Sequence, residues 1–420
     1  MTKIFSNTQP VQVDMVDAFC VLQKGFTDQF VYYDKTRKIR YMGLGRCIAL
    51  RSLHEVESVL QGEAKEEPVF FSFTRFDAEN PKETDDLFNA FPQLKLMLPE
   101  VVLIENEQGT FLQINSLGPV YAGRIERFAR QAMAAPARKR ASIPYTLETD
   151  SRANWDAMVN DGLAAIAAKR VEKVVLSRRL KLVAKTPFSS KDLLVNLIDG
   201  TSRGTVLLYR YGDVFYCGCT PELLVRKRGL AVESMCLAGT AGVGESLEEG
   251  ARLTEGLLHN EKDLREHAFV VDFMREVFKR NCHDVDIANE PDVLMLQHVQ
   301  HLYTPAKAQV MEGASLNGLL KQLHPTPALS GAPVGEALML IRQIESYNRG
   351  LFGGACGYVN AAGDGEFSVG LRTGVFDGEI GWIYAGCGIV ADSDPAAEYD
   401  ETELKFKTVL SAFDGQGTYE

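Results

Sequence analysis

The chain has 420 residues, 45% of them hydrophobic and 24% charged, with a formal net charge of −11 at pH 7, which is ordinary for a folded globular protein. This negative charge argues against nucleic acid or an anionic membrane surface as the partner. Because no apolar run approaches the roughly 18 residues of a membrane span, and the eight cysteines form no disulfide framework, we expect a cytoplasmic protein.

The first part of the chain, residues 1–140, alternates short apolar runs with polar helical stretches and carries no evident chemistry. The runs Val69–Phe71 and Val101–Ile104 are typical of strands. A segment rich in alanine, proline and basic residues, AMAAPARKRASIP at 132–144, follows this part. We predict an N-terminal region joined by this segment to a larger C-terminal region.

A helix and a strand open the larger region. Helical spacing predicts a helix over residues 155–166, because the apolar residues lie at Trp155, Met158, Val159, Leu163 and Ile166. The stretch VEKVVLSRRL, residues 171–180, then places Lys173 before the apolar run Val174–Leu176, which ends on Ser177 and two arginines. A lysine at the end of a strand is most often solvated.

Two pairs of apolar runs flank turn residues and indicate β-hairpins. Their strands are expected at Thr205–Tyr211, Val214–Cys219, Phe367–Phe376 and Ile380–Tyr384, with another strand at Ala231–Met235. Residues 248–280 form a long, mostly helical stretch, and Asp394 with Pro395 marks the start of a closing helix. Hairpins interleaved with helices predict an α+β protein with large antiparallel sheets.

Carboxylates lie on the apolar faces of both late helices. Glu266 shares a stripe with Val270, Phe273 and Val277, and Asp263 lies one turn earlier on the same face. These residues either mark a helix end that emerges into water or face inward, where an unpaired charge is too costly.

In the final helix, Glu398, Glu401 and Lys405 also share one face. Acidic residues in a first helical turn often only complement the helix dipole. If both helices turn their carboxylates inward, however, the oxygens suit a hard cation such as Mg²⁺.

Arg372 alternates with small residues in its predicted strand, so Ser368, Gly370 and Arg372 are expected on one face. That leaves room for a ligand carboxylate, which arginine binds through two parallel hydrogen bonds; a structural carboxylate partner is the equal alternative. Gly386 and Gly388, and the small-residue turn LAGT at 237–240, permit close approach of the backbone to a ligand. Together these features outline a site for a small, multiply charged acid.

Seven motifs occur in the order found in chorismate-utilising enzymes. They are VEKVVLSRRL (171–180), TPELL (220–224), LAGT (237–240), EKDLREH (261–267), HPTPALSG (324–331), YAGCGIV (384–390) and EYDETELK (398–405). On these motifs residues 150–415 resemble the family of isochorismate synthases, salicylate synthases, and component I of anthranilate and aminodeoxychorismate synthases. The resemblance implies an α+β fold of two packed, largely antiparallel sheets with outer helices, and an active site in the central cleft.

The resemblance also implies Mg²⁺ as cofactor and chorismate, a dicarboxylate, as substrate. By motif match the metal ligands are Glu266 and Glu401, supported by Asp263 and Glu398. Nine residues are expected to bind or contact the substrate: Gly239, Thr240, His301, Ala328, Tyr358, Arg372, Gly386, Gly388 and Lys405.

The branches of the family differ in the nucleophile that attacks the ring, which is ammonia in the aminating enzymes and water in isochorismate and salicylate synthases. Anthranilate synthases resemble this strand but typically carry glutamine where Lys173 stands, so Lys173 is interpreted as the base that activates water, in its neutral form. Glu222 is interpreted as the acid that protonates the departing 4-hydroxyl. Ala328, where pyruvate-expelling relatives usually have threonine, favours a product that stays isochorismate.

We therefore predict an isochorismate synthase of the menaquinone-pathway type, although HPTPALSG also resembles the siderophore branch. Salicylate synthase is the alternative, and an inactive family member that acts as a scaffold is a third hypothesis, disfavoured by the intact set of site residues. We expect no glutaminase subunit, and a monomer or a weak homodimer.

Overall fold

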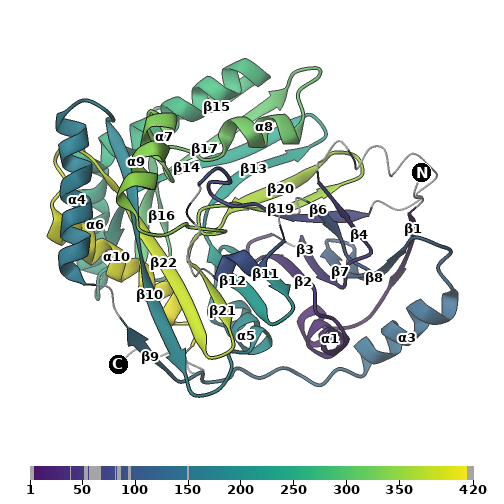
Figure 1. Ribbon diagram of the computed structural model, residues 1–420. Helices are drawn as coiled ribbons and strands as arrows, with labels where there is room; N and C mark the ends of the chain where they lie inside the picture. Colours follow the sequence, from purple (N-terminus) through teal and green to yellow (C-terminus); the bar gives the residue numbers. More distant parts are fainter. Residues whose placement is uncertain are drawn as a thin grey trace.

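Two antiparallel β-sheets pack face to face, and helices cover their outer faces (Figure 1). The computed structural model describes residues 4–413 apart from 38, 52–54, 56–67, 81, 83–86, 93–95 and 149–150. The α+β fold with two packed antiparallel sheets, expected from the sequence, is confirmed.

The first sheet has twelve strands among the described residues. In spatial order they are β1 (Phe5–Pro10), β8 (Gly109–Ser116), β7 (Val101–Asn106), β3 (Arg40–Leu44), β2 (Gln29–Asp34), β11 (Thr205–Tyr211), β12 (Val214–Thr220), β21 (Thr373–Asp377), β22 (Ile380–Ile389), β10 (Lys173–Ala184) and β18 (Gly331–Ala332), with β9 (Tyr145–Glu148) beside β10.

The second sheet has ten strands among the described residues. In spatial order they are β15 (Cys282–Ile287), β17 (Val299–Val310), β14 (Ala231–Gly242), β13 (Leu223–Arg228), β20 (Gly365–Val369), β19 (Ala355–Asn360), β5 (Val69–Phe73), β6 (Leu96–Leu98) and β4 (Ile48–Leu50), with β16 (Asp292–Met295) beside β17.

The helices pack on the outer faces of the two sheets (Figure 1). They are α1 (Met15–Leu22), α3 (Ala122–Met133), α4 (Arg152–Ala167), α5 (Ser190–Gly200), α6 (Leu247–His259), α7 (Glu261–Asn281), α8 (Leu316–Leu323), α9 (Val334–Ile344) and α10 (Pro395–Leu410), with short 3₁₀ turns at Gln23–Gly25 and Leu87–Ala90. None of the helices in the described ranges is long and apolar enough to cross a membrane.

Three clusters of buried apolar side chains pack these layers together. An aromatic core lies between the sheets and includes Tyr32 and Tyr209 from the first sheet and Phe71 and Tyr358 from the second. A second core lies between the first sheet and helices α1, α3, α5 and α10. The third joins strands β10 and β22 and the second sheet to helices α4, α7, α8 and α9. Alternate residues of each strand face opposite sides, so each sheet supplies side chains to the inner core and to an outer one.

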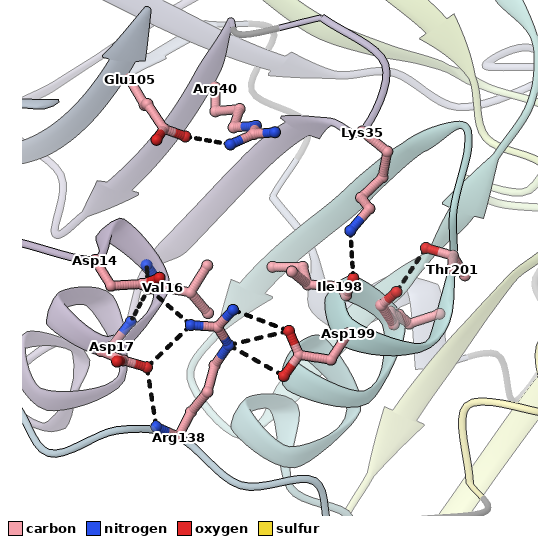
Figure 2. A network of polar contacts seen from close by, with 11 residues as sticks. Asp14, Val16, Asp17, Lys35, Arg40, Glu105, Arg138, Ile198, Asp199 and Thr201 are labelled. Carbon is pink, nitrogen blue, oxygen red and sulfur yellow. Dashed lines mark hydrogen bonds and ion pairs between the residues drawn. The ribbon is translucent and has the colours of Figure 1, made fainter. Parts of the chain in front are cut away.

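The N-terminal region supplies strands to both sheets. Strand β2 pairs with β11 in the first sheet, and β5 pairs with β19 in the second. The basic segment 132–144 forms the extended connection between α3 and β9, and Arg138 within it reaches the carboxylates of Asp14, Asp17 and Asp199 (Figure 2). The boundary between residues 1–140 and 150–415 stays a prediction.

Two local expectations from the sequence were wrong, and two others are made more precise by the structure. Residues 367–376 are not one strand: β20 ends at Val369 and β21 begins at Thr373, because the chain changes sheets between them. The LAGT stretch is a β-bulge inside β14, since the register with β17 shifts between Ala238 and Thr240. The helical stretch 248–280 is two helices, separated at Asn260, which caps α7. Strand β10 runs on through both arginines to Ala184.

Candidate active site

Two neighbouring crossovers between the sheets carry Glu222 and Arg372. The chain leaves β12 at Thr220 and enters β13 at Leu223, so Glu222 lies on the passage from the first sheet to the second. It returns from β20 to β21 through residues 370–372. The crossovers are joined by main-chain hydrogen bonds, in which Cys219 N donates to Arg372 O at 3.3 Å and Val369 N donates to Glu222 O at 3.0 Å.

Arg372 has a left-handed backbone conformation, with φ of 54°. A non-glycine residue adopts this conformation at a cost, which the surrounding packing must hold. A Cβ atom on Gly218 would lie 2.2 Å from Arg372 O, so only glycine lets β12 lie against this crossover. Arg372 is therefore fixed by the change of sheet and by its neighbour in β12, and strand alternation alone does not place it.

The guanidinium of Arg372 has no carboxylate partner in the part of the chain that the structure describes. Its Nη2 donates to Nε2 of His301 at 3.2 Å, and its Nε is buried without a hydrogen bond. Burial lowers the pKa of Arg372 to about 10, although Glu401 and Glu222 act to raise it. A buried cation without its own anion is costly, so this arginine fits a ligand carboxylate better than a structural ion pair.

His301 has one tautomer that satisfies its surroundings. Arginine can only donate, so Nε2 of His301 accepts from Arg372, and the proton of the neutral ring lies on Nδ1. That nitrogen lies 3.1 Å from the carbonyl oxygen of Gly239 and 3.1 Å from Oγ1 of Thr240. Burial, with Arg372 and Lys405 nearby, holds the pKa of His301 well below its usual value, so the ring stays neutral.

Glu222 is a carboxylic acid kept protonated by burial. The residue is 4% exposed, and burial raises the pKa of Glu222 to about 8, although Lys173, Arg372 and Lys405 act to lower it. At neutral pH this side chain can therefore donate a proton. The sequence motif predicted the residue, and the structure provides the environment that its predicted role needs.

Lys173 is fully buried at the start of β10, and its Nζ lies 3.0 Å from Oε1 of Glu266. The solvated strand end suggested by the sequence pattern is thereby excluded. A Cβ atom on Gly388 would lie 2.2 Å from Oε1 of Glu266 and 2.7 Å from Cε of Lys173. Gly388 therefore makes room for this ion pair, whereas the sequence had suggested room for a ligand.

Carboxylates from α7 and α10 face one another beside the Lys173–Glu266 pair. Glu401 accepts from Nζ of Lys405 at 2.6 Å, and Glu398 contacts Lys262. Burial, together with Glu266 and Glu401, raises the pKa of Asp263 to about 7. Burial and Glu401 likewise raise the pKa of Glu398. The four carboxylates of this group outnumber the three lysines that contact them, Lys173, Lys262 and Lys405.

Such a donor set fits a hard divalent cation, because carboxylate oxygens are the ligands that Mg²⁺ prefers. No group of three or more His, Cys, Asp or Glu side chains in the described residues is arranged as a ready metal cage. Magnesium sites often use one or two protein carboxylates and complete the shell with water and substrate. Glu266 and Glu401 match that kind of site.

Ten of the predicted site residues line one cleft between the sheets. They are Glu222, Gly239, Thr240, Glu266, His301, Ala328, Arg372, Gly386, Gly388 and Lys405. Lys173 contacts Glu266, while Asp263 is affected by the charges of Glu266 and Glu401 and Glu398 by that of Glu401. Residues far apart in the sequence therefore meet at one cleft, and binding of an acid there stays a prediction.

Tyr358 does not line this cleft, contrary to our expectation. Its side chain is buried in the aromatic core between the sheets, where its ring lies 4.5 Å from that of Tyr41 and 5.2 Å from that of Tyr32. Alternation along β19 puts Tyr358 on the inner face of the sheet, away from the end of the sheet where the cleft opens. Phe352, from the preceding loop, lines the cleft instead.

Sequence reasoning missed a buried ion pair in the wall of the cleft. Nη2 of Arg349 lies 2.6 Å from Oε1 of Glu345, and both side chains are almost fully buried. Arg349 also donates to the carbonyl oxygens of Leu329 and Val175, and Glu345 accepts from the backbone and hydroxyl of Ser177. The pair thus fastens the HPTPALSG loop to strand β10. Its i, i+4 spacing was visible in the sequence but is typical of exposed helices.

Comparisons with known proteins agree with this geometry. Residues 1–414 match the family described as chorismate binding enzyme. The chain is similar to the isochorismate synthase MenF of Bacillus subtilis, at 33% identity over 83% of this chain and 75% of that protein. It is also similar to the salicylate biosynthesis isochorismate synthase of Pseudomonas aeruginosa, at 32% identity over 82% and 74%.

Among solved structures, the menaquinone-specific isochorismate synthase MenF from Escherichia coli matches with a TM-score of 0.83 and 22% identity, over 98% of this chain and 94% of that one. At this identity the match concerns the fold alone. It covers both sheets and the N-terminal region that the motifs had matched loosely.

Proposed function

The chain belongs to the chorismate-binding enzyme family, and from this premise we propose that it is an isochorismate synthase. The enzyme would convert chorismate to isochorismate by adding water at ring position 2 with loss of the 4-hydroxyl. The observation that carries the proposal is a buried acid, Glu222, whose pKa is about 8, in a cleft that also holds a buried cation without an anion of its own, Arg372.

Each chemical step then has a residue suited to it. Lys173, in its neutral amine form, would accept a proton from the attacking water, and the 3.0 Å contact of its Nζ with Oε1 of Glu266 holds the amine in position. Glu222 would give its proton to the 4-hydroxyl, which departs as water while the ring double bonds shift. One water enters and one leaves, so the reaction is an isomerisation.

Substrate binding would rest on the cationic side of the cleft. Arg372 is fixed by its crossover and by His301, so its free donors are preorganised for a carboxylate. Lys405 is held by Glu401 and by the carbonyl oxygen of Gly386, at 2.6 and 2.7 Å. Two fixed cations in a buried cleft suit a dicarboxylate better than a neutral or cationic molecule.

Magnesium is part of the proposal, with Glu266 and Glu401 as its ligands and Asp263 and Glu398 in support. A bound Mg²⁺ would supply positive charge that holds a substrate carboxylate. The raised pKa of Asp263 supports this assignment, because it reflects burial together with repulsion from Glu266 and Glu401, and a bound cation would relieve both.

The nucleophile and the fate of pyruvate separate this function from its neighbours in the family. Lys173 supports water chemistry, since aminating relatives typically have glutamine at the matching position. Ala328 lines the cleft without a hydroxyl group, which supports a product that keeps its enolpyruvyl group. Salicylate synthase is the second candidate, and similarity to the relative named for salicylate biosynthesis is the reason to test it.

The deciding experiment is product analysis after incubation with chorismate and Mg²⁺, with and without an ammonium salt. We expect isochorismate in both, no pyruvate and no aminated product. Salicylate with stoichiometric pyruvate would replace the proposal by the second candidate, and an aminated product would replace it by an anthranilate-type reaction. We assign the product to menaquinone biosynthesis, and a deletion strain that keeps its menaquinone would contradict that assignment.

A further inference from the structure

A second cavity adjoins the cleft at Arg372 and Pro221. It has a volume of about 320 Å³. Arg372 and Pro221 line both the cleft and this cavity. The other walls come from the turn that precedes β11, the turn between β16 and β17, and Thr408 of α10. Arg372 can therefore be approached from two sides.

The lining of this cavity is cationic in a protein whose net charge is −11. It holds two arginines, Arg203 and Arg372, with the hydroxyls of Ser202 and Thr408 and the amide of Gln297, and none of its described lining residues is acidic. Such a lining attracts anions and repels cations. The Nε of Arg372 is buried without a hydrogen bond, so the guanidinium that this cavity shares with the cleft keeps an unused donor.

Arg203 is exposed, and no carboxylate of the described residues lies within ion-pair distance of it. Its side chain also borders a neighbouring cavity that contains Asp34 and Glu233. Those two carboxylates are already paired, Asp34 with Arg37 and Glu233 with Arg226. Arg203 thus keeps its charge available to a mobile anion.

The turn that carries Arg203 is held rigidly by its neighbours. Lys35 N donates to Gly204 O at 2.9 Å. Gly204 has a φ of 96°, and a Cβ atom there would lie 2.7 Å from the carbonyl oxygen of Thr220. Figure 2 shows Lys35 and Thr201 also bonded to the C-terminal turn of α5. A cation on a rigid turn makes a better binding group than one on a loose loop.

We propose that this cavity is a staging site for the dicarboxylate substrate, where Arg203 binds one carboxylate before Arg372 receives it in the cleft. The inference rests on the proposed function for the identity of the substrate, but not for the binding of a dicarboxylate. Because Arg203 lies outside the cleft, it affects the rate and affinity of substrate binding and not the chemical step.

Arg203→Gln tests the site, with Arg203→Lys as the variant that keeps the charge. We expect Arg203→Gln to leave kcat unchanged and to lower kcat/KM for chorismate three- to tenfold at low ionic strength. The deficit should shrink as salt is raised, because screening removes the advantage of the exposed charge. Arg203→Lys should recover most of kcat/KM. Arg127→Gln, an exposed arginine on α3, is the matched control and should behave as wild type.

Equal kcat/KM for Arg203→Gln and Arg127→Gln at low salt would overturn the proposal. A fall in kcat alone would also overturn it, since it would place Arg203 in the chemistry. If the wild-type protein makes no isochorismate, the proposed function fails, and the staging site is then judged by calorimetric titration with chorismate and with succinate. An Arg203→Gln variant that binds both as wild type does would reject the site in that case too.

Discussion

Arg138 and Arg372 are both largely buried arginines, but their partners differ. Arg138 bonds with three carboxylates, Asp14, Asp17 and Asp199, at 2.7 to 3.1 Å (Figure 2). Arg372 has a neutral histidine as its hydrogen-bonded partner and an orphaned Nε. The first arginine fastens the connection between the two parts of the chain to α1 and α5, whereas the second faces a cleft.

The difference shows how a structural cation can be told from a functional one. A buried charge with its full set of anions stabilises the fold and has nothing left to bind. A buried charge without such anions destabilises the fold, and a ligand of opposite charge can remove that penalty. Lys173 and Lys181, in the same strand, each contact a carboxylate, Glu266 and Glu148, so burial and not pairing distinguishes them: Lys173 is fully buried, whereas Lys181 lies near the surface.

The largest effect is expected from Lys173→Ala. Removing a general base costs about 10²- to 10⁴-fold, so kcat should fall by that factor while chorismate binding, measured by calorimetry, stays within about threefold. Lys181→Ala, in the same strand, should retain wild-type kinetics. Full activity of Lys173→Ala would reject the assignment of the base.

Arg372→Ala and Arg138→Ala should have opposite consequences. Losing charge-assisted hydrogen bonds to a carboxylate costs about 1.5–3 kcal/mol, so Arg372→Ala should raise KM by about 10- to 150-fold. Its free energy of unfolding should not fall, because the variant removes an unpaired buried cation. A loss of stability without a change in KM would make Arg372 structural and would remove the contrast with Arg138.

The pH dependence of kcat/KM should reflect the protonation of Glu222. Activity needs its protonated form, so kcat/KM should be halved near pH 8, where the pKa of Glu222 lies, and fall about tenfold per further pH unit. This folded-state pKa exceeds the ordinary value of 4.5, so the carboxyl stabilises the fold at low pH and loses that contribution as pH rises through 8. Relative to wild type, Glu222→Gln should therefore gain stability between pH 5 and pH 9, measured by denaturant unfolding.

Glu266→Gln should weaken magnesium binding by about tenfold or more, since one charged ligand becomes neutral. The midpoint of a Mg²⁺ titration of activity measures this shift. An unchanged midpoint would count against the ligand role of Glu266. Glu261→Gln, at the start of the same helix, is a suitable control.

Arg138→Ala should have the smallest effect on function. We expect a loss of about 1–2 kcal/mol in the free energy of unfolding, typical of a networked and partly exposed ion pair, and unchanged kcat and KM. Part of that loss should disappear at high salt, because salt screens the wild-type network. A change in KM would show that the connection between the two parts communicates with the cleft.

Local patterns in the sequence predicted the helices and the carboxylates well. Glu266 and Glu401 could be placed because helical spacing is a short-range property, and the capping pair Asp394 and Pro395 sets the start of α10. The family motifs supplied the roles of Lys173 and Glu222, whose environments depend on segments far away in the sequence.

The sequence could not predict features that depend on the packing of the two sheets. Tyr358 was expected in the cleft from the family resemblance alone, which does not show that this face of β19 packs into the aromatic core between the sheets. Arg372 was expected inside a strand, since its left-handed φ arises from a change of sheet. Arg349 was missed because its pairing with Glu345 has the spacing of an ordinary surface pair.

The two joined crossovers provide a fixed frame from which the walls of the cleft can be varied separately. Main-chain hydrogen bonds of 3.0 and 3.3 Å hold the backbones of Glu222 and Arg372 on the two crossovers. Ala328 and Phe352 line the same cleft but lie outside both crossovers. Substitutions at those two positions are expected to change which ring acid fits while the two crossovers stay joined.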